Sequence, residues 1–209
     1  ARPRVREGRR EVTVRRRSAY ADRLLEFCDL VFSDGAEFQQ RGAWRAFFDR
    51  RIGPPFDGRI IFEIGCNDAE LLANVAAKHP TTAFIGIDWK CRALHTAATR
   101  IAPAGLQNVA LLHGRAQDVR RIFDDGEVDE IWIFHPEPCD KPQELRNRLM
   151  AEPFLIDAHR VLRAESRLIL KTDHGEYFQS VLELLKSSGA VARRFEPAIQ
   201  SFDFWNDAP

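Results

Sequence analysis

The sequence predicts an α/β fold in which a mostly parallel central sheet carries helices on both faces. After Gly53-Pro54-Pro55, short apolar runs rich in β-branched residues alternate with longer segments whose apolar residues recur at helical spacing. Five such runs are each followed by a helical segment, the order that builds parallel strands joined by crossover helices. A content of 44% hydrophobic and 30% charged residues in 209 residues suits a domain with a buried core.

The expected elements follow one another without repeats or low-complexity stretches. Strands are predicted at 60–65, 83–88, 109–112, 129–134 and 167–172. Helices are predicted at about 68–78, 90–101, 116–123, 145–162 and 175–188. Before the first strand, helical periodicity predicts a helix over Tyr20 to Phe32 and a short one over Trp44 to Phe48, which would cap the domain.

Charge is placed unevenly along a chain whose net charge is zero. Residues 1–17 hold eight arginines and two glutamates, which leaves 23 basic and 29 acidic residues elsewhere, a net charge of −6. We therefore divide the chain into an Arg-rich N-terminal arm (1–17), a helical cap (18–55) and a main α/β domain (56–209). Two interpretations of the arm stay open: a solvated tail, or a polycation that makes salt-sensitive contacts with nucleic-acid phosphates.

Composition also bears on the cellular location of the protein and on disulfides and metal sites. No stretch reaches the ~20 apolar residues of a membrane helix and no apolar run resembles a signal peptide, so we expect a cytoplasmic protein without membrane contact. The four cysteines are far apart and the six histidines do not cluster. This spacing argues against a disulfide framework and predicts no metal site.

Ligands of parallel α/β sheets bind at the carboxyl ends of the strands, so the residues that close each strand are the candidates for a site. The first strand closes with Glu63, Ile64, Gly65, Cys66 and Asn67, where a nucleotide-binding fold places GxGxG. Gly65 allows a close backbone approach, and Asn67 stands in for the second glycine because asparagine tolerates left-handed geometry. An ordinary strand-to-helix turn would also explain this motif.

The second strand, AFIGIDW, ends at Asp88, 25 residues after Glu63. An acid at this spacing accepts hydrogen bonds from the ribose hydroxyls of an adenosine. The alternative is that Asp88 only caps the helix that starts at Lys90, but the spacing favours ribose binding. Trp89 would then pack on the adenine face, unless it is an ordinary core or surface tryptophan.

The fourth and fifth strands bring further polar residues to the same edge. Two prolines in DEIWIFHPEPCDK keep the loop after the fourth strand extended, which presents an acid, expected to be buried, and a nearby base to an acceptor. The fifth strand, RLILKTDHGEY, ends in a threonine and an aspartate at the same rim. The candidate acceptor residues are His135, Glu137, Lys141, Thr172 and Asp173.

Together these segments resemble the bacterial tRNA (guanine-N7)-methyltransferase family from about Trp44 to Leu185. The matching motifs are FEIGCND, FIGID, IWIFHPEPCDK, PFLIDAHRVL and LILKTD, in the order of the family. The resemblance implies a Rossmann-like class I methyltransferase whose domain 56–209 binds S-adenosyl-L-methionine. The expected cofactor site consists of Glu63, Gly65, Cys66, Asn67, Asp88, Trp89, Arg115 and Ala116.

The acceptor residues carry over in part. Glu137 replaces the aspartate of the family's loop, Lys141 matches its lysine, and Thr172 and Asp173 match its TD motif. Cys139, however, replaces the tryptophan of PDPW.

Two further departures concern binding. Residues 142–144, Pro-Gln-Glu, stand where the family has basic residues and a histidine that would meet RNA, so that only Arg146 and Arg148 remain of the basic cluster. Arg115 replaces an aspartate that would accept the adenine amino group. Because an arginine side chain offers no acceptor, its backbone or the following Gln117 and Asp118 would have to substitute.

Methyl transfer from a sulfonium mainly needs alignment, and a ring nitrogen of the N7 type has no proton to lose, so no general base is required. Glu137 and Asp173 are the expected catalytic residues, which orient donor groups of the ring, while Lys141 would fix an acceptor oxygen or phosphate. The alternative for Glu137 and Lys141 is an ion pair that closes the loop.

Three functions remain open. The first, favoured by the acidic body and the altered loop, is an N-methyltransferase of a small purine-like or other nitrogen heterocycle. The second, favoured by the resemblance and the Arg-rich arm, is a tRNA (guanine-N7)-methyltransferase. The third is a non-catalytic adaptor that binds S-adenosylmethionine or RNA.

Overall fold

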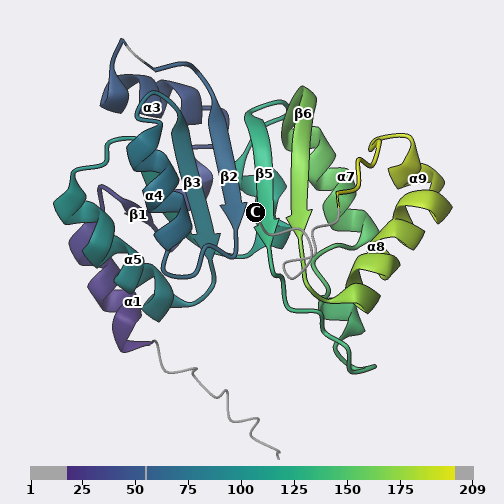
Figure 1. Ribbon diagram of the computed structural model, residues 1–209. Helices are drawn as coiled ribbons and strands as arrows, with labels where there is room; N and C mark the ends of the chain where they lie inside the picture. The colour runs from purple at the N-terminus through teal and green to yellow at the C-terminus, as the bar shows by residue number, and fades with distance from the viewer. Residues whose placement is uncertain (1–17, 55, 201–209) are drawn as a thin grey trace, which may run out of the picture.

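The structure is a computed structural model and describes residues 18–54 and 56–200, so the Arg-rich arm lies outside the described residues. A six-stranded sheet runs through the described part in the order β1-β4-β3-β2-β5-β6, and each neighbouring pair is parallel (Figure 1). The strands are β1 (Val31–Phe32), β2 (Ile60–Ile64), β3 (Ala83–Asp88), β4 (Val109–His113), β5 (Val128–Phe134) and β6 (Leu162–Lys171).

Helices connect the strands and cover the sheet on both faces. They are α1 (Ala19–Leu24), α2 (Ala36–Gln39), α3 (Trp44–Ile52), α4 (Glu70–Lys78), α5 (Cys91–Ala104), α6 (Val119–Ile122), α7 (Glu152–Val161), α8 (Gly175–Ser187) and α9 (Gly189–Ala192). Short 3-10 turns lie at η1 (Leu25–Phe27), η2 (Ala116–Asp118) and η3 (Leu145–Asn147).

The alternation of side chains along each strand divides the core into two layers. In β2, Phe62 belongs to the cluster that packs under α3, α6, α7 and α8, whereas Ile61 belongs to the cluster under α1, α4 and α5. Phe84 and Ile85 of β3 divide in the same way. Since successive residues of a strand face opposite sides, both must be apolar in a sheet that is covered twice, which explains the unbroken apolar runs.

The helix predicted over Tyr20 to Phe32 is wrong in its second half. Helical structure ends at Phe27, and Val31 and Phe32 form the edge strand β1, which pairs with Leu111 and Leu112 of β4. Val31 packs in one core layer and Phe32 in the other, so their burial needs an extended chain. Segment 18–54 therefore contributes a strand to the same sheet and is not a purely helical cap.

The long helix predicted at 145–162 is also divided. Residues 145–147 form only the turn η3, and α7 begins at Glu152, with Pro153 in its first turn. Proline is favoured in the first turn of a helix because its missing N–H is not needed there. Pro153 therefore marks the start of α7, which the apolar periodicity alone did not show.

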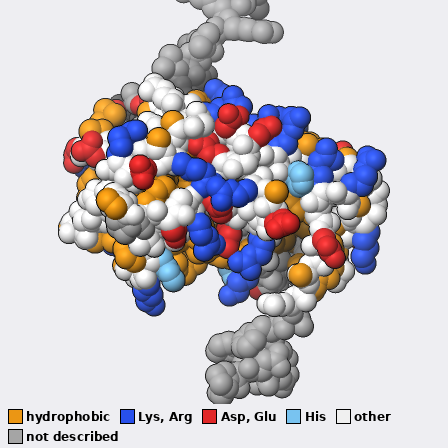
Figure 2. Space-filling view, turned by 90° about the horizontal axis from the view of Figure 1, so that it is seen from above, with side chains coloured by type: hydrophobic (Ala, Val, Ile, Leu, Met, Phe, Trp, Pro, Cys, Tyr) orange, Lys and Arg blue, Asp and Glu red, His pale blue; other side chains and the backbone are white. Residues whose placement is uncertain are grey.

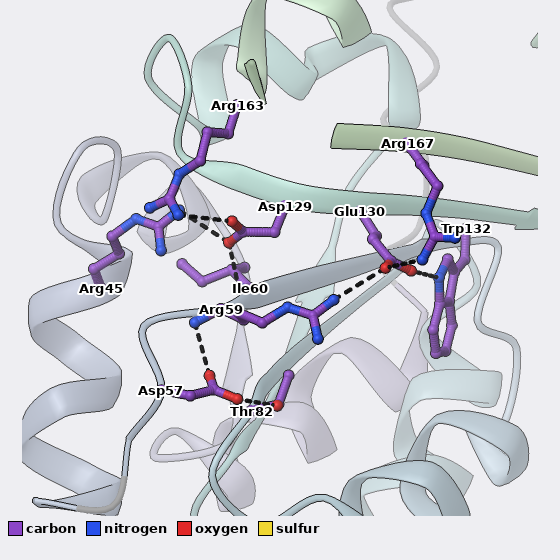
Figure 3. A network of polar contacts seen from close by, with 10 residues as sticks. All are labelled: Arg45, Asp57, Arg59, Ile60, Thr82, Asp129, Glu130, Trp132, Arg163 and Arg167. Atoms are coloured by element: carbon purple, nitrogen blue, oxygen red, sulfur yellow. Dashed lines mark hydrogen bonds and ion pairs between the residues drawn. The ribbon is translucent and has the colours of Figure 1, made fainter. Parts of the chain in front are cut away.

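Buried acids at the start of β5 tie the amino ends of three strands together (Figure 3). Asp129 accepts a hydrogen bond from the N–H of Ile60 at 2.8 Å and forms ion pairs with Arg45 at 3.0 Å and Arg163 at 3.2 Å. These contacts join β5 to β2, to α3 and to β6.

Glu130 is the second acid of this network. Its Oε1 lies 3.0 Å from Arg59 and 2.7 Å from Arg167, and its Oε2 accepts a hydrogen bond from Trp132 Nε1. Burial tends to raise the pKa of Glu130, but the hydrogen bonds from Trp132 and Arg167 hold it below its ordinary value. In Figure 2, which views the molecule from this side, basic side chains gather across the middle of the face with acidic ones among them.

Candidate active site

The candidate site lies at the carboxyl ends of the strands, at the lower edge of the sheet in Figure 1. Because β2 and β3 are parallel neighbours, Glu63 and Asp88 close adjacent strands. The turn after β2 is held to β3 by hydrogen bonds from the N–H groups of Gly65 and Cys66 to the carbonyl of Ile87, at 2.9 and 3.1 Å. The first motif and the second strand end thus form one unit.

The turn after β2 has the backbone geometry that the sequence predicts. Gly65 has φ 77° and Asn67 has φ 50°, so asparagine does occupy the left-handed region in place of a glycine. Ala69, at φ 52°, is a further left-handed residue, which the sequence did not indicate. Cys66 is buried in this turn, and burial is the largest cause that raises the pKa of its thiol. Its thiol is therefore a packing group and not a nucleophile.

Glu63 gives the strongest indication that this edge of the sheet binds a ligand. Its side chain is buried, the residue being 6% exposed, and its Oε2 has no hydrogen-bond partner. Burial raises the pKa of Glu63 to about 7. A buried carboxylate oxygen without a donor is costly, so a bound molecule that offers an N–H or O–H group there would be favoured.

Asp88 shapes the backbone on both sides of it. Its Oδ2 accepts a hydrogen bond from the backbone N–H of Asn67 at 3.1 Å, and its Oδ1 accepts one from the backbone N–H of Lys90 at 2.8 Å. Lys90 is the N-cap residue of α5, and no side chain caps the first turn of that helix, so the contact does not make Asp88 a helix cap. A carboxylate has about four lone-pair sites, so these two bonds leave acceptors for ribose hydroxyls.

The remaining cofactor candidates surround Asp88. Trp89 is 64% exposed, with the ammonium group of Lys90 5.4 Å from its ring centroid. The N–H of Gly114 donates to the carbonyl of Asp88 at 3.1 Å and so holds the turn after β4 against β3. Exposed Arg115 and half-buried Ala116 follow at the start of η2. The structure thus brings the cofactor candidates of β2, β3 and β4 to one edge.

The loop after β5, residues 135–148, is called the acceptor loop below. His135 continues the sheet through an N–H donated to the carbonyl of Lys171 at 2.8 Å, although its φ is 49°. Its Nδ1 lies 3.2 Å from Oδ1 of Asp173, and the hydrogen bond from His135 is the main cause that lowers the pKa of Asp173. His135 and Asp173, from neighbouring strands, therefore form a pair at the rim.

The expected burial of Glu137 is wrong. Its side chain is 81% exposed, and its Oε1 lies 3.9 Å from Nζ of Lys90. The flanking Pro136 and Pro138 lie in a stretch without helix or strand. The ion pair between Glu137 and Lys141 of the alternative interpretation is not found among the described residues. Glu137 pairs with Lys90 instead, which joins the turn after β3 to the acceptor loop.

Lys141 does not face Glu137. Its Nζ lies 3.5 Å from Oε1 of Glu144, and neither side chain is buried, so this pair contributes little to stability. A hollow of about 330 Å³ is lined by Glu137, Pro138, Cys139, Asp140, Lys141 and Glu144.

Arg148 of the basic cluster and Thr172 of the TD motif form hydrogen bonds within the protein. Arg148 is turned inward, with its side chain 21% exposed and its Nε donating to the carbonyl of Pro138 at 2.8 Å, whereas Arg146 is exposed. The hydroxyl oxygen of Thr172 accepts a hydrogen bond from the N–H of His174 at 3.1 Å. Of the two arginines that remain of the basic cluster, only Arg146 is therefore exposed.

A family described as putative methyltransferase matches residues 57–198. A tRNA (guanine-N(7)-)-methyltransferase of Geobacillus kaustophilus is 32% identical over 170 residues, which cover 81% of this chain and 75% of that protein. The chain belongs to the tRNA (guanine-N7)-methyltransferase family.

Two further relatives of the same description are shorter matches. The protein of Cytophaga hutchinsonii is 31% identical over 69% of this chain and 63% of its own length. That of Rubrobacter xylanophilus is 30% identical over 68% of this chain and 64% of its own length. The chain therefore spans a little less than two thirds of these two relatives. The resemblance drawn from the motifs, to a methyltransferase family that uses S-adenosyl-L-methionine, is confirmed at the level of the family.

Solved structures agree on the fold. An antibiotic-related methyltransferase superposes with a TM-score of 0.53 at 17% identity, over 72% of this chain and 74% of that one. A precorrin-6y C5,15-methyltransferase from Geobacter metallireducens gives 0.50 at 16% identity, over 69% of each chain. These likenesses confirm the Rossmann-like class I fold expected for this family member.

Two other kinds of site are absent from the described residues. Within residues 18–54 and 56–200, no helix combines the length and apolarity needed to cross a bilayer. The same ranges contain no group of three His, Cys, Asp or Glu side chains arranged to hold a metal ion.

Proposed function

We propose that this chain transfers a methyl group from S-adenosyl-L-methionine to N7 of a guanine in tRNA. The observation that carries the proposal is membership of a family whose relatives are named for this reaction, over 81% of the chain in the Geobacillus kaustophilus match. The small nitrogen heterocycle, which composition and the altered loop placed first, has no comparable support among the relatives. The non-catalytic adaptor is disfavoured because the relatives are named for a methyltransferase.

The cofactor would lie along the ends of β2, β3 and β4. Its sulfonium supplies an activated methyl group, so the protein has mainly to bind and align. Glu63 fits this role because its unpartnered Oε2 would accept a hydrogen bond from an amino group, and Asp88 would accept from the ribose. The backbone of Gly65, Cys66 and Asn67 allows close approach, and exposed Trp89 offers a face for the adenine ring.

The backbone after β4 would complete the adenine pocket. The side chain of Arg115 can only donate hydrogen bonds, so the adenine amino group would need the backbone carbonyl groups near Arg115 and Ala116 as acceptors. Gln117 adds an exposed amide in the same turn.

The acceptor guanine would bind between the ends of β5 and β6. N7 carries a lone pair and no proton, so the transfer requires orientation and not a general base. Asp173, held by His135, would accept hydrogen bonds from guanine N–H groups, and exposed Glu137 would do so from the opposite side. Thr172 would position its neighbour Asp173 through its bond with His174, and Lys141 would contact an acceptor oxygen or phosphate.

Phosphate contacts would come from exposed Lys141 and Arg146 and from the Arg-rich arm. Each phosphate contact adds about 0.7–0.9 to the slope of log affinity against log salt concentration. Replacing Arg15, Arg16 and Arg17 by serine should therefore lower this slope for tRNA by about 2. An unchanged slope would show that the arm is a solvated tail.

A direct assay tests the proposed reaction. The full chain is incubated with S-adenosyl-L-methionine and unmodified tRNA, and 7-methylguanosine is measured by mass spectrometry after digestion of the RNA to nucleosides. We expect 7-methylguanosine with the wild-type protein and loss of it with Asp88→Ala. Glu183→Gln, an exposed acid of α8, serves as the matched control. Calorimetric binding of the cofactor without methylation of any tRNA would contradict the proposal.

A further inference from the structure

The acceptor loop is fastened to α8 by contacts that the reaction itself does not use. Asp140, in the middle of the loop, lies between the ring of His174 and the guanidinium group of Arg148. Its Oδ2 is 2.9 Å from Nε2 of His174, and its Oδ1 is 3.2 Å from an NH2 nitrogen of Arg148. His174 directly precedes α8, so the first contact joins the loop to the start of that helix.

The two ring nitrogens of His174 have different tasks. Nδ1 accepts the N–H of Tyr177 at 3.1 Å and so caps α8. Because a backbone N–H can only donate, Nδ1 carries no proton in this contact, and the proton of the neutral ring lies on Nε2, which faces Asp140. The N–H of His174 also donates to Thr172. One residue thus links the end of β6, the start of α8 and the acceptor loop.

Arg148 secures the other end of the loop. Its Nε donates to the carbonyl of Pro138 at 2.8 Å, and an NH1 nitrogen donates to Oγ of Ser180 in α8 at 3.2 Å. Its guanidinium carbon lies 5.4 Å from the ring centroid of Tyr177, a cation–π distance. The loop is therefore held to α8 at Asp140 and at Arg148, and Arg148 binds Pro138 within the loop.

The loop needs such an anchor because its own backbone is unfavourable. His135 and Cys139, one at each end of the segment that carries Glu137, have φ values of 49° and 51°, in a region that costs non-glycine residues energy. Residues 136–140 form neither helix nor strand and so lack a ladder of backbone hydrogen bonds. Contacts from outside the segment must offset this cost.

We propose that Asp140, Arg148 and His174 are positioning residues that hold the acceptor loop against α8, so that Glu137 and Asp173 face one acceptor. This inference rests on the proposed methyl transfer to tRNA. Since the Arg-rich arm, which lies outside the loop, would supply most of the phosphate contacts with tRNA, displacement of the loop should appear mainly in kcat and much less in KM. The cofactor residues lie on other strands, so cofactor affinity should not change.

Two substitutions of His174 separate its tasks. In His174→Asn the amide can still cap α8, because asparagine is among the best N-cap residues, but its shorter side chain does not reach Asp140. In His174→Gln an amide nitrogen replaces Nε2, so the contact with Asp140 is kept and the cap is lost. A purely structural cap would therefore be damaged more by His174→Gln, whereas loop positioning would be damaged more by His174→Asn.

The experiment measures kcat, KM for tRNA and the cofactor dissociation constant of the full chain. We expect His174→Asn and Asp140→Asn each to lower kcat about tenfold to 100-fold, with KM and the cofactor constant within about twofold of wild type. His174→Gln should retain most of kcat, and the double variant His174→Asn/Asp140→Asn should lose no more than either single variant. Equal losses in His174→Gln and His174→Asn, or an unchanged kcat in His174→Asn, would overturn the proposal.

Amide hydrogen exchange of residues 137–147 separates this inference from the proposed function. Exchange should be faster in His174→Asn than in wild type and in His174→Gln, even if no tRNA is methylated. If the wild-type protein methylates no tRNA, the proposed substrate would be contradicted, but the proposed anchoring of the loop would not. Equal exchange in all three proteins would overturn the anchoring itself.

Discussion

A Cβ atom on Gly86 would lie 2.9 Å from Sγ of Cys66, so the middle of β3 and the cofactor turn are in direct contact. The same atom would lie 3.2 Å from Leu72 of α4. We therefore expect Gly86→Ala to lower the free energy of unfolding by about 1–3 kcal/mol and to weaken cofactor binding, because Cys66 must move. Urea unfolding and calorimetric titration with S-adenosyl-L-methionine check both effects.

Removing the opposing sulfur should relieve part of this strain. In the double variant Gly86→Ala/Cys66→Ala, we expect stability and cofactor affinity to recover relative to Gly86→Ala alone. Strictly additive losses in the double-mutant cycle would show that the two positions do not press on each other.

The raised pKa of Glu63 predicts a pH-dependent cofactor affinity. With a pKa of about 7, Glu63 is largely protonated at acid pH and cannot accept from an ammonium group through a charged oxygen. Affinity for S-adenosyl-L-methionine should therefore rise as pH increases from about 6 to about 7.5. Calorimetry at several pH values measures it, and Glu63→Gln should bind more weakly and lose this dependence. A pH-dependent affinity retained in Glu63→Gln would assign the titration to another group.

The same group predicts an effect of opposite sign on stability. The folded protein holds Glu63 at a pKa above its ordinary value of 4.5, so ionising it disfavours the fold. Below about pH 4.5 the carboxyl is neutral in both the folded and the unfolded protein, so the free energy of unfolding is not reduced. As pH rises through 7, ionisation of Glu63 reduces the free energy of unfolding by an amount that reaches about 3 kcal/mol. In the absence of cofactor, Glu63→Gln should unfold at higher urea concentration than wild type at pH 8, but not at pH 4. Equal midpoints at pH 8 would contradict the buried, unpartnered state of the carboxylate.

Glu130, at the opposite edge, should show the usual behaviour of a paired acid. Hydrogen bonds from Trp132 and Arg167 lower its folded pKa against the effect of burial. Its contribution to stability is therefore present above the ordinary pKa of 4.5 and is lost as pH falls through the lowered value. Glu130→Gln should be less stable than wild type at pH 7, with the difference shrinking in acid, as thermal unfolding at each pH would show. A difference that is independent of pH would count against the ion pairs with Arg59 and Arg167.

The pair His135–Asp173 predicts which step of the reaction fails without it. We expect Asp173→Asn to lower kcat about 100-fold while cofactor affinity stays within about twofold of wild type, because Asp173 follows β6 and the cofactor residues lie at the ends of β2, β3 and β4. Single-turnover methylation and calorimetry measure the two quantities. Loss of cofactor binding would instead place Asp173 in the donor site.

The sequence predicts the strand ends well because they obey a simple rule. Once five apolar runs alternate with helices, their carboxyl ends must share an edge, and Glu63, Asp88 and Asp173 do so. The strand β1 was missed because two residues are too few for a periodic pattern, although Val31 and Phe32 face opposite layers of the core.

The path of the acceptor loop could not be predicted, since it depends on contacts far along the chain. The motif placed Glu137 beside a base in a buried site, but nothing in its residues shows that Lys90 would be the nearer cation. In the same way, Arg148 looks like a surface cation in the sequence, and only the position of α8 turns it inward. Local patterns specify elements, whereas loops are set by their tertiary partners.

The arginine–carboxylate network around Asp129 and Glu130 has a consequence for protein engineering. It fixes the register of β2, β5 and β6 at their amino ends, so the strands do not depend on the loops at their carboxyl ends for alignment. Libraries that vary the exposed positions of residues 141–147 would thus sample new methyl acceptors without unravelling the sheet. A scaffold locked at one edge and variable at the other is a suitable starting point for directed evolution.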